Sequence, residues 1–317
     1  MRLGAAHWVC LLCLGCTEAV QKDPTHFIYV YGDTAESPTD QGGDDSGEAE
    51  TLRPLPDRVS GLAAGWGHSC ELSTSGEVSC WGRDSHGQAT SPSGKFLQIS
   101  AGHLHNCGLR ENGTLFCWGN NTDGETEPPS GQFIQVDTAA DFSCAVDRRG
   151  EVACWGGLQL FDESIPPSGP FETVFAGWFN TCGQREDRRL DCWGWDAFEQ
   201  SSPPGLAFES VALGYWHGCA IEASGQMHCW GNNQHGQGDV PPGEYQAVSA
   251  GEFHTCGLLT NGAVECWGWN IDGQSTPPTG RRFSQIACGG IHSCALDEES
   301  GWECWGSDDF GQLSPAR

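Results

Sequence analysis

Residues 256–268 read Cys-Gly-Leu-Leu-Thr-Asn-Gly-Ala-Val-Glu-Cys-Trp-Gly, which is a cysteine, nine residues with a turn signal, a second cysteine, and Trp-Gly. The same phrase occurs seven times, and successive first cysteines lie 37 or 38 residues apart. A fixed period of this size is typical of solenoids, propellers and arrays. The seven pairs are Cys70 and Cys80, Cys107 and Cys117, Cys144 and Cys154, Cys182 and Cys192, Cys219 and Cys229, Cys256 and Cys266, and Cys294 and Cys304.

Each phrase has the pattern of a β-hairpin. Asn261-Gly262 and Asn112-Gly113 lie midway between their cysteines, where a turn with glycine in the left-handed region is expected. The two cysteines of a unit would then face each other across the antiparallel ladder at a separation that a disulfide can bridge. We favour pairing within each unit because every unit carries both halves, and pairing between neighbouring units is the alternative.

The array is predicted to close into a ring. An aromatic residue opens a short apolar strand in six units, from Phe96 in the second to Phe283 in the seventh, and Val59 stands there in the first. The last unit ends at Pro315 without such a strand after it, while residues 58–65 supply one at the other end. We therefore expect an all-β, seven-bladed propeller over residues 58–317, whose N-terminal strand completes the last blade.

The clearest copy of the whole repeat spans Ala250 to Gln274 and reads Ala-Gly-x-x-His-Thr-Cys-Gly-Leu, then Val-x-Cys-Trp-Gly-x-Asn-x-x-Gly-Gln. It resembles the repeat of the regulator-of-chromosome-condensation superfamily, and its length is closest to that of the bacterial propeller-type β-lactamase inhibitor protein. The resemblance implies a seven-bladed propeller, but the superfamily holds an exchange factor, chromatin binders and enzyme inhibitors, so it leaves function open. Phe142 and Asn180 depart from it, because other units have histidine there.

The first sixteen residues have a basic start and a short apolar run, which predicts a signal peptide over residues 1–16. Leu14-Gly15-Cys16 is similar to a lipobox, so Cys16 is the candidate for lipidation, and an ordinary signal peptide cut a few residues later is the alternative. Residues 17–57 are expected to be a disordered acidic linker, since residues 33–52 hold seven acidic residues and no Lys or Arg.

Charge and cysteine content indicate where the protein works. A formal net charge of −27 repels phosphate and disfavours nucleic-acid partners, and it leaves a lipid anchor as the only expected membrane contact. The chain has 18 cysteines, fourteen of them in equivalent pairs, which indicates disulfides and an oxidising compartment. We expect an extracytoplasmic protein, either a lipoprotein of the bacterial cell envelope or a secreted one.

Five histidines occupy the same place in their units. Different blades would hold them apart, so we expect no metal site and assign them to backbone groups inside each blade. We find no catalytic motif and expect no enzyme activity and no cofactor. These histidines are His68, His105, His217, His254 and His292.

The loops that vary between units should carry recognition. In a meander, the loop before each His-Thr-Cys phrase and the loop after each Trp-Gly emerge on the same face. Aromatic and polar residues in them form the candidate binding face: Trp66, His103, Trp178, Tyr215, Trp216, Phe253, Asp84, Asn120, Trp195 and Trp269. Such a surface is typical of protein recognition, with an enzyme or a surface protein as the partner. The alternatives are glycan binding, because Trp and Tyr stack on sugars, and an enzyme with its site at the central channel.

Overall fold

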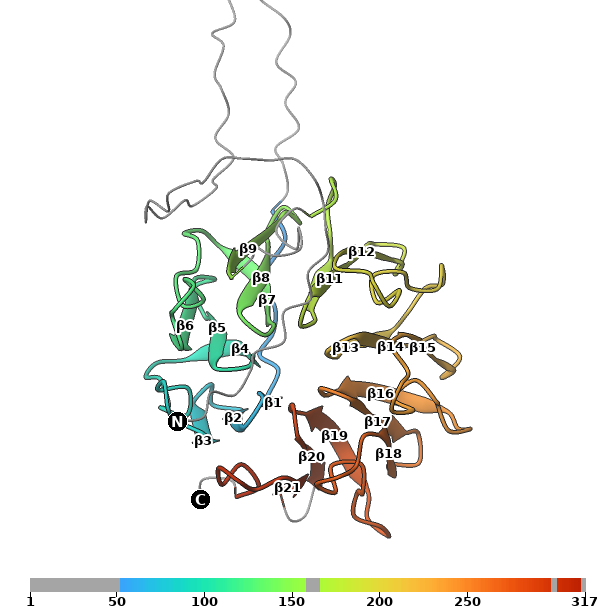
Figure 1. Cartoon of the computed structure of the whole chain (residues 1–317). Helices are drawn as coiled ribbons and strands as arrows, with labels where there is room; N and C mark the ends of the chain where they lie inside the picture. The colour runs from blue at the N-terminus through green and yellow to red at the C-terminus, as the bar shows by residue number, and fades with distance from the viewer. Residues whose placement is uncertain (1–51, 158–165, 298–300, 315–317) are drawn as a thin grey trace, which may run out of the picture. The chain divides into compact units, whose positions relative to one another are not determined.

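The computed structural model describes residues 52–157, 166–297 and 301–314, and these contain 21 strands in seven three-stranded antiparallel sheets (Figure 1). No helix in this part of the chain is long and apolar enough to cross a membrane. We number the sheets as blades 1 to 7 in chain order. The strands are β1 (Gly61–Ala64), β2 (His68–Leu72) and β3 (Val78–Gly82); β4 (Phe96–Ala101), β5 (His105–Arg110) and β6 (Leu115–Gly119); β7 (Phe133–Thr138), β8 (Phe142–Asp147) and β9 (Val152–Gly156); β10 (Thr173–Ala176), β11 (Asn180–Gln184) and β12 (Leu190–Gly194); β13 (Ser210–Leu213), β14 (His217–Ile221) and β15 (Met227–Gly231); β16 (Tyr245–Ala250), β17 (His254–Leu259) and β18 (Val264–Gly268); β19 (Phe283–Cys288), β20 (His292–Asp297) and β21 (Gly301–Gly306).

The innermost strands form a closed circle. Each contacts the innermost strand of the next blade, from β1 through β4, β7, β10, β13 and β16 to β19, and β19 contacts β1. The prediction of an all-β, seven-bladed propeller is therefore confirmed.

The paired cysteines join the middle and outer strands of each blade. In blade 6, Cys256 is directly opposite Cys266, and the turn between them places Gly262 at φ 85°, in the left-handed region that favours glycine. All seven disulfides form within units, with Cα–Cα separations of 4.0 to 4.1 Å, so pairing between neighbouring units is excluded. The bonds join Cys70 to Cys80, Cys107 to Cys117, Cys144 to Cys154, Cys182 to Cys192, Cys219 to Cys229, Cys256 to Cys266, and Cys294 to Cys304.

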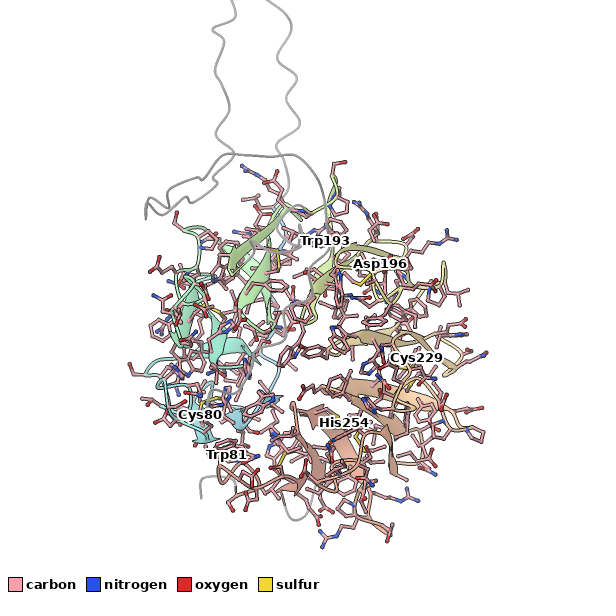
Figure 2. All side chains as sticks on the ribbon, viewed as in Figure 1. Cys80, Trp81, Trp193, Asp196, Cys229 and His254 are labelled. Carbon is pink, nitrogen blue, oxygen red and sulfur yellow. A yellow bond between two sulfur atoms is a disulfide. The ribbon has the colours of Figure 1, made fainter. Side chains whose placement is uncertain are left out.

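The core lies between neighbouring sheets rather than inside one sheet (Figure 2). Cys70, Leu72 and Val78 of blade 1 pack against Phe96 and Trp118 of blade 2. Because each blade buries its apolar face only against a neighbour, the blades depend on one another for stability.

The repeated tryptophan and histidine connect each blade to the next by hydrogen bonds. The indole Nε1–H of Trp267 donates to the backbone oxygen of Gln237 at the end of the preceding unit, at 2.8 Å, and the hydroxyl of Thr255 donates to the same oxygen at 2.9 Å. The Thr255 oxygen is then free to accept from Nε2 of His217 in blade 5, at 2.9 Å. The expectation that these histidines bind backbone groups inside their own blade is wrong, because each faces a side chain of the next blade.

Four other histidines make the same kind of contact across a blade boundary, at 2.8 Å in each case. The pairs are His68 with Asn106, His105 with Ser143, His254 with Ser293, and His292 with Ser69.

Asn180 stands where most units have histidine. It compensates for a departure at a different position of the repeat in the next blade. Blade 5 has Gly218 where its neighbours have a hydroxyl or amide side chain, so it offers no donor to the oxygen of Gln200. Asn180 supplies that donor itself, with Nδ2 at 2.9 Å from the Gln200 oxygen, beside the usual bond from Trp230. A Cβ atom at position 218 would lie 2.4 Å from the Trp230 ring, so blade 5 needs glycine there. Asn180 in blade 4 supplies the donor that this glycine cannot.

Ring closure differs from the expectation. The N-terminal strand β1 pairs with β2 of its own unit, from Gly61 opposite Leu72 to Ala64 opposite Ser69, so it completes the first blade and not the last. Closure comes from the contacts that every other boundary uses, since Trp81 Nε1 donates to the oxygen of Gln312 at 2.9 Å. The prediction assigned the strand to the wrong sheet because it joined each innermost strand to the blade before it. In the structure, each innermost strand belongs to the sheet of the two strands that follow it.

The residues just before β1 run along the side of the ring that carries the hairpin turns. Arg53 exchanges hydrogen bonds with Arg148 in the β8–β9 turn and pairs with Glu172 at 2.8 Å. Arg58 donates to the oxygen of Phe96 at 2.8 Å and forms an ion pair with Glu111. The chain therefore enters the propeller from the hairpin side. Residues 1–51, with the predicted signal peptide, Cys16 and most of the acidic linker, lie outside the described residues.

Candidate binding face at the channel mouth

The two variable loops of each blade are held together by one backbone hydrogen bond. In blade 4 the N–H of Trp195, directly after Trp-Gly, donates to the oxygen of Phe179 at 2.8 Å, and Trp269 donates to Phe253 in the same way in blade 6. The equivalent bond is present in all seven blades, at 2.7 to 3.0 Å. The two sets of loops therefore share one side of the ring, opposite the hairpin turns.

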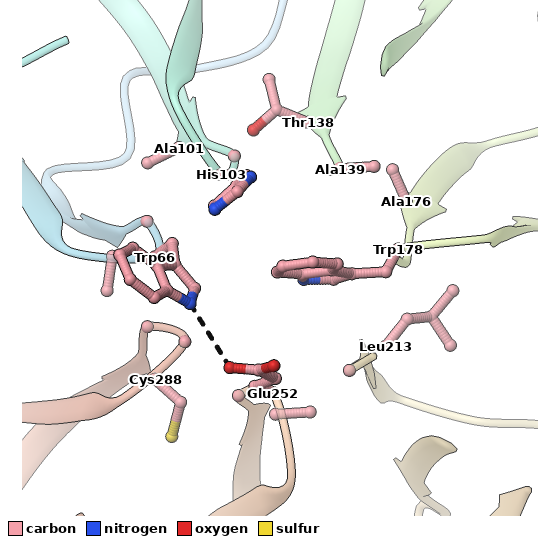
Figure 3. Close-up of a pocket in the computed structure, with 18 residues that line it drawn as sticks. Trp66, Ala101, His103, Thr138, Ala139, Ala176, Trp178, Leu213, Glu252 and Cys288 are labelled. Carbon is pink, nitrogen blue, oxygen red and sulfur yellow. Dashed lines mark hydrogen bonds between the residues drawn. The ribbon is translucent and has the colours of Figure 1, made fainter. Parts of the chain in front are cut away.

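The second residue after each inner strand lies at the mouth of the central channel, and five of these seven residues line its cavity. These seven positions hold Trp66, His103, Ala140, Trp178, Tyr215, Glu252 and Gly290. Backbone hydrogen bonds connect them to the neighbouring blade. The N–H of Trp66 donates to the oxygen of Gly102 at 3.3 Å, and the N–H of Glu252 donates to the oxygen of Gly290 at 3.3 Å. The channel holds a cavity of about 80 Å³, and Figure 3 shows Trp66, His103, Trp178 and Glu252 pointing toward one another at its mouth.

The predicted aromatic residues form one continuous surface. Trp66 contacts His103 with ring centroids 5.3 Å apart, His103 contacts Trp178 at 5.0 Å, and Trp178 contacts Tyr215 at 4.3 Å. From Tyr215 the contacts continue outward to Phe253 at 5.2 Å. The remaining predicted rings join the same network, which we call the aromatic face: Trp216 on Tyr215, Trp195 on Trp216, and Trp269 on Phe253.

Two of the predicted site residues shape their loops instead. The exposed carboxylate of Asp84 accepts a hydrogen bond from the N–H of Ala89 at 2.8 Å, and Asp196 makes the matching bond to Ser201 at 2.7 Å. Asn120 is half-buried and donates to Glu125 at 2.5 Å. We therefore assign Asp84 and Asn120 to loop conformation, and their role in binding stays a prediction.

Sequence reasoning missed part of the face. Phe198 lies 5.3 Å from Trp216, and His235 lies 4.5 Å from Trp269. Both stand two residues before a buried glutamine whose side-chain oxygen accepts their backbone N–H, at 2.9 Å in each case. The same position holds Phe310 in the last unit, so the spacing to that glutamine is a signal that would have identified all three.

Burial sets the charge states at the mouth. Glu252 accepts one hydrogen bond, from Trp66 Nε1 at 3.3 Å, and its burial raises the pKa of the carboxyl group. Burial lowers the pKa of His103 to about 4, so its ring is neutral at pH 7. The pKa of Tyr215 is raised by burial and then by the carboxylates of Glu252 and Asp141. The mouth is thus aromatic, with the carboxyl group of Glu252 and no protonated histidine.

One cluster has the spacing of metal ligands, because His254, Cys256 and Cys288 have ligand atoms within 4.8 Å of one another. Cys256 is bonded to Cys266, so it offers no thiolate. Burial raises the pKa of Cys288 to about 11, and its thiol stays protonated. This cluster is not a metal site.

Comparison with known proteins supports the repeat and the fold. The family model for the regulator of chromosome condensation (RCC1) repeat matches residues 59–88, 96–125, 208–237 and 245–274, which lie in units 1, 2, 5 and 6. No sequence among the curated proteins matches the chain.

Several solved structures are similar. The ectodomain of the receptor kinase CR4 from Physcomitrella patens is 27% identical with a TM-score of 0.69, and the match covers 78% of this chain and 72% of that one. The CRINKLY WD40 ectodomain of the Arabidopsis thaliana receptor kinase ACR4 is 24% identical with a TM-score of 0.68, over 81% of this chain and 100% of that one. Prp20p from Saccharomyces cerevisiae is 17% identical with a TM-score of 0.65, over 74% and 81%, and is described with its binding to Gsp1p and histones. The similarities to ACR4 and Prp20p concern the fold alone. The resemblance in repeat length to the bacterial β-lactamase inhibitor protein stays a prediction.

Proposed function

Because this chain is a seven-bladed propeller of RCC1-like repeats, we propose that it is an extracytoplasmic protein that binds another protein through the aromatic face and has no catalytic activity. The observation that carries the proposal is the unbroken contact network from Trp66 to Trp269 on one side of the ring. Large aromatic side chains dominate the energetics of protein interfaces, and contiguous patches of them on a soluble surface mark interaction sites.

The rigid frame favours a preformed interface. Every loop of the face is fixed by a backbone hydrogen bond, and each blade is closed by a disulfide. Aromatic side chains held in this way lose little conformational entropy on binding, which improves affinity for a given contact area.

The setting is inferred from the sulfur chemistry. Seven disulfides are typical of an oxidising compartment, and the similar receptor-kinase chain from Physcomitrella patens is an ectodomain. Lipidation of Cys16 would attach the protein to a membrane through residues 17–51. The chain enters the propeller at Arg53 on the hairpin side, which is the side of the ring opposite the aromatic face.

The test is a quantitative binding comparison. A partner captured from native envelopes with the purified protein is identified by mass spectrometry, and its affinity is then measured for the parent, Trp178→Ala, Trp216→Ala and Trp269→Ala. We expect at least one variant to lose about 30-fold in affinity, the effect of removing an interface residue worth about 2 kcal/mol. Phe116→Ala, on the outer strand of blade 2, is the matched control.

Unchanged affinity in all three tryptophan variants would remove the aromatic face from the proposal. A partner lost equally in Phe116→Ala would show that the substitutions act through folding.

A further inference from the structure

The channel mouth has the composition of a cation site. Of the seven ring positions, three carry Trp66, Trp178 and Tyr215, and a fourth carries the carboxylate of Glu252. Trp178 contacts Tyr215 at 4.3 Å, and Glu252 is attached to Trp66 by the hydrogen bond from Nε1 (Figure 3). Trp66, Trp178 and Glu252 line the cavity itself, and Tyr215 contacts Trp178 from outside it.

The carboxylate of Glu252 has no cationic partner among the described residues. The hydrogen bond that it accepts comes from a neutral indole, although the side chain is half-buried. A buried carboxylate loses hydration, and that loss is offset when a cation or several donors approach it. Tyr215 is exposed to the same negative potential, which comes from Glu252 and Asp141.

The other titratable groups nearby leave room for a positive charge. His103 is neutral at pH 7 because burial lowers its pKa to about 4. The guanidinium of Arg83 lies 5.3 Å from the Trp66 ring and 5.2 Å from Phe310, so one cation already stacks at the outer part of the face and opposes a second cation on that part of Trp66. The strongly acidic chain, with a net charge of −27, favours the approach of a second cation.

Below the mouth the channel wall combines small apolar side chains with the backbone of glycines. The small side chains end the inner strands and include Ala64, Ala101, Ala176 and Ala250. A cavity of about 80 Å³ has room for one compact organic group in place of a few water molecules. Methyl or methylene groups would contact the alanines while the charge stays level with the rings.

We propose that the mouth of the channel binds an alkylammonium group between Trp66 and Trp178, whose ring Tyr215 contacts from outside the cavity, with Glu252 as its counter-ion. Aromatic faces attract such cations through their quadrupole, and quaternary ammonium groups are commonly bound in aromatic cages. The group can belong to a free quaternary ammonium compound or to a lysine side chain. The proposal goes beyond protein binding by the aromatic face and does not depend on it.

Calorimetric titration with choline tests the site. Its neutral analogue 3,3-dimethylbutan-1-ol has the same shape with carbon in place of nitrogen, so it separates charge from volume. We expect choline to bind in the millimolar range, the analogue to bind at least tenfold more weakly, and Glu252→Gln to weaken choline binding at least tenfold. Trp178→Ala should weaken it as well, while Glu186→Gln, in a hairpin turn on the opposite side, should not.

Titration with Nα-acetyl-lysine methylamide and its trimethylated form distinguishes the two sources. Binding of either one at least as tightly as choline assigns the site to a protein side chain, and preference for choline assigns it to a free compound. Equal binding of choline and its neutral analogue, full retention of choline binding in Glu252→Gln, or no heat from any probe at 50 mM would overturn the proposal. Near-ultraviolet circular dichroism of each variant confirms that the ring is folded, so a loss of binding reports on the site.

Discussion

Lowering the pH from 7.5 to 5.0 should destabilise the propeller through its five buried histidines. At the boundary between blades 5 and 6, Thr255 donates its proton to the oxygen of Gln237, so His217 must carry a proton on Nε2 to donate to Thr255. Its Nδ1 is buried without a partner, and the same holds for the other four. A second proton would therefore create a buried charge and an N–H with no acceptor.

The sign follows from the pKa values. Burial lowers the pKa to about 4 in His68 and His217 and to about 3 in His105, His254 and His292, against 6.5 for the unperturbed side chain. Between these values the unfolded chain binds more protons than the folded one, so this stability is fully present above pH 6.5 and declines as the pH falls toward 3 to 4.

At pH 5.0, protonation of each histidine stabilises the unfolded chain by about 2 kcal/mol, because pH 5.0 is about 1.5 units below the unperturbed pKa and one unit corresponds to 1.36 kcal/mol. Five such groups could lower the free energy of unfolding by about 10 kcal/mol, a large part of the 5–15 kcal/mol typical of a domain. Burial raises the pKa of Asp137, which works in the opposite direction, so variants are needed to isolate the histidines.

The assay is guanidinium unfolding of the oxidised protein at both pH values, followed by tryptophan fluorescence. His217→Asn and His254→Asn are suitable because Asn180 occupies this place in blade 4. Each should reduce the difference in unfolding free energy between pH 7.5 and 5.0 by about 2 kcal/mol. His86→Asn, with an exposed ring, should leave that difference unchanged. If both buried variants keep the full pH dependence of the parent, the reasoning is refuted.

Three further outcomes follow from contacts described above. Replacing Cys219 and Cys229 by serine should lower the free energy of unfolding by about 3 kcal/mol, since the bond closes a short loop in the unfolded chain, and a midpoint equal to the parent's in denaturant would contradict this. The thiol of Cys288, buried and with its pKa raised to about 11, should react with a chromogenic disulfide reagent only after unfolding, so rapid labelling of the native protein would count against its burial. Trp267→Phe removes the indole donor to Gln237 and should cost about 1–3 kcal/mol in the same unfolding assay, whereas Trp269→Phe, which lacks that bond, should cost less.

Local features were predictable from the sequence. The hairpins, the disulfides within units and the number of blades depend on residues close in the chain, such as Cys256 and Cys266 around the Asn261-Gly262 turn. The meander order of the strands predicted that the two variable loops of each blade lie on the same side of the ring. The backbone hydrogen bond from Trp195 to Phe179 confirms this prediction.

Contacts between blades were harder to predict. The partner of His217 is Thr255, 38 residues away, and the choice between a backbone group and that hydroxyl depends on how two sheets are placed side by side. The sheet to which β1 belongs likewise depends on where a unit begins, which a periodic sequence leaves open. Which rings touch at the mouth depends on side-chain rotamers and on the curvature of the ring, so Trp178 and Tyr215 could be assigned to one face but not to one contact.

The boundary between the last blade and the first has a consequence for how such rings vary in size. None of the described strands crosses it. Trp81 donates to the oxygen of Gln312 in the same way as Trp305 donates to Gln274 at a boundary within the continuous chain. A gene duplication that copies one whole unit would therefore create a boundary identical to the existing ones and would disturb no special closing element. The blade count is then determined by the wedge angle between packed sheets, and the ends of the chain could be moved to another loop without loss of the circle.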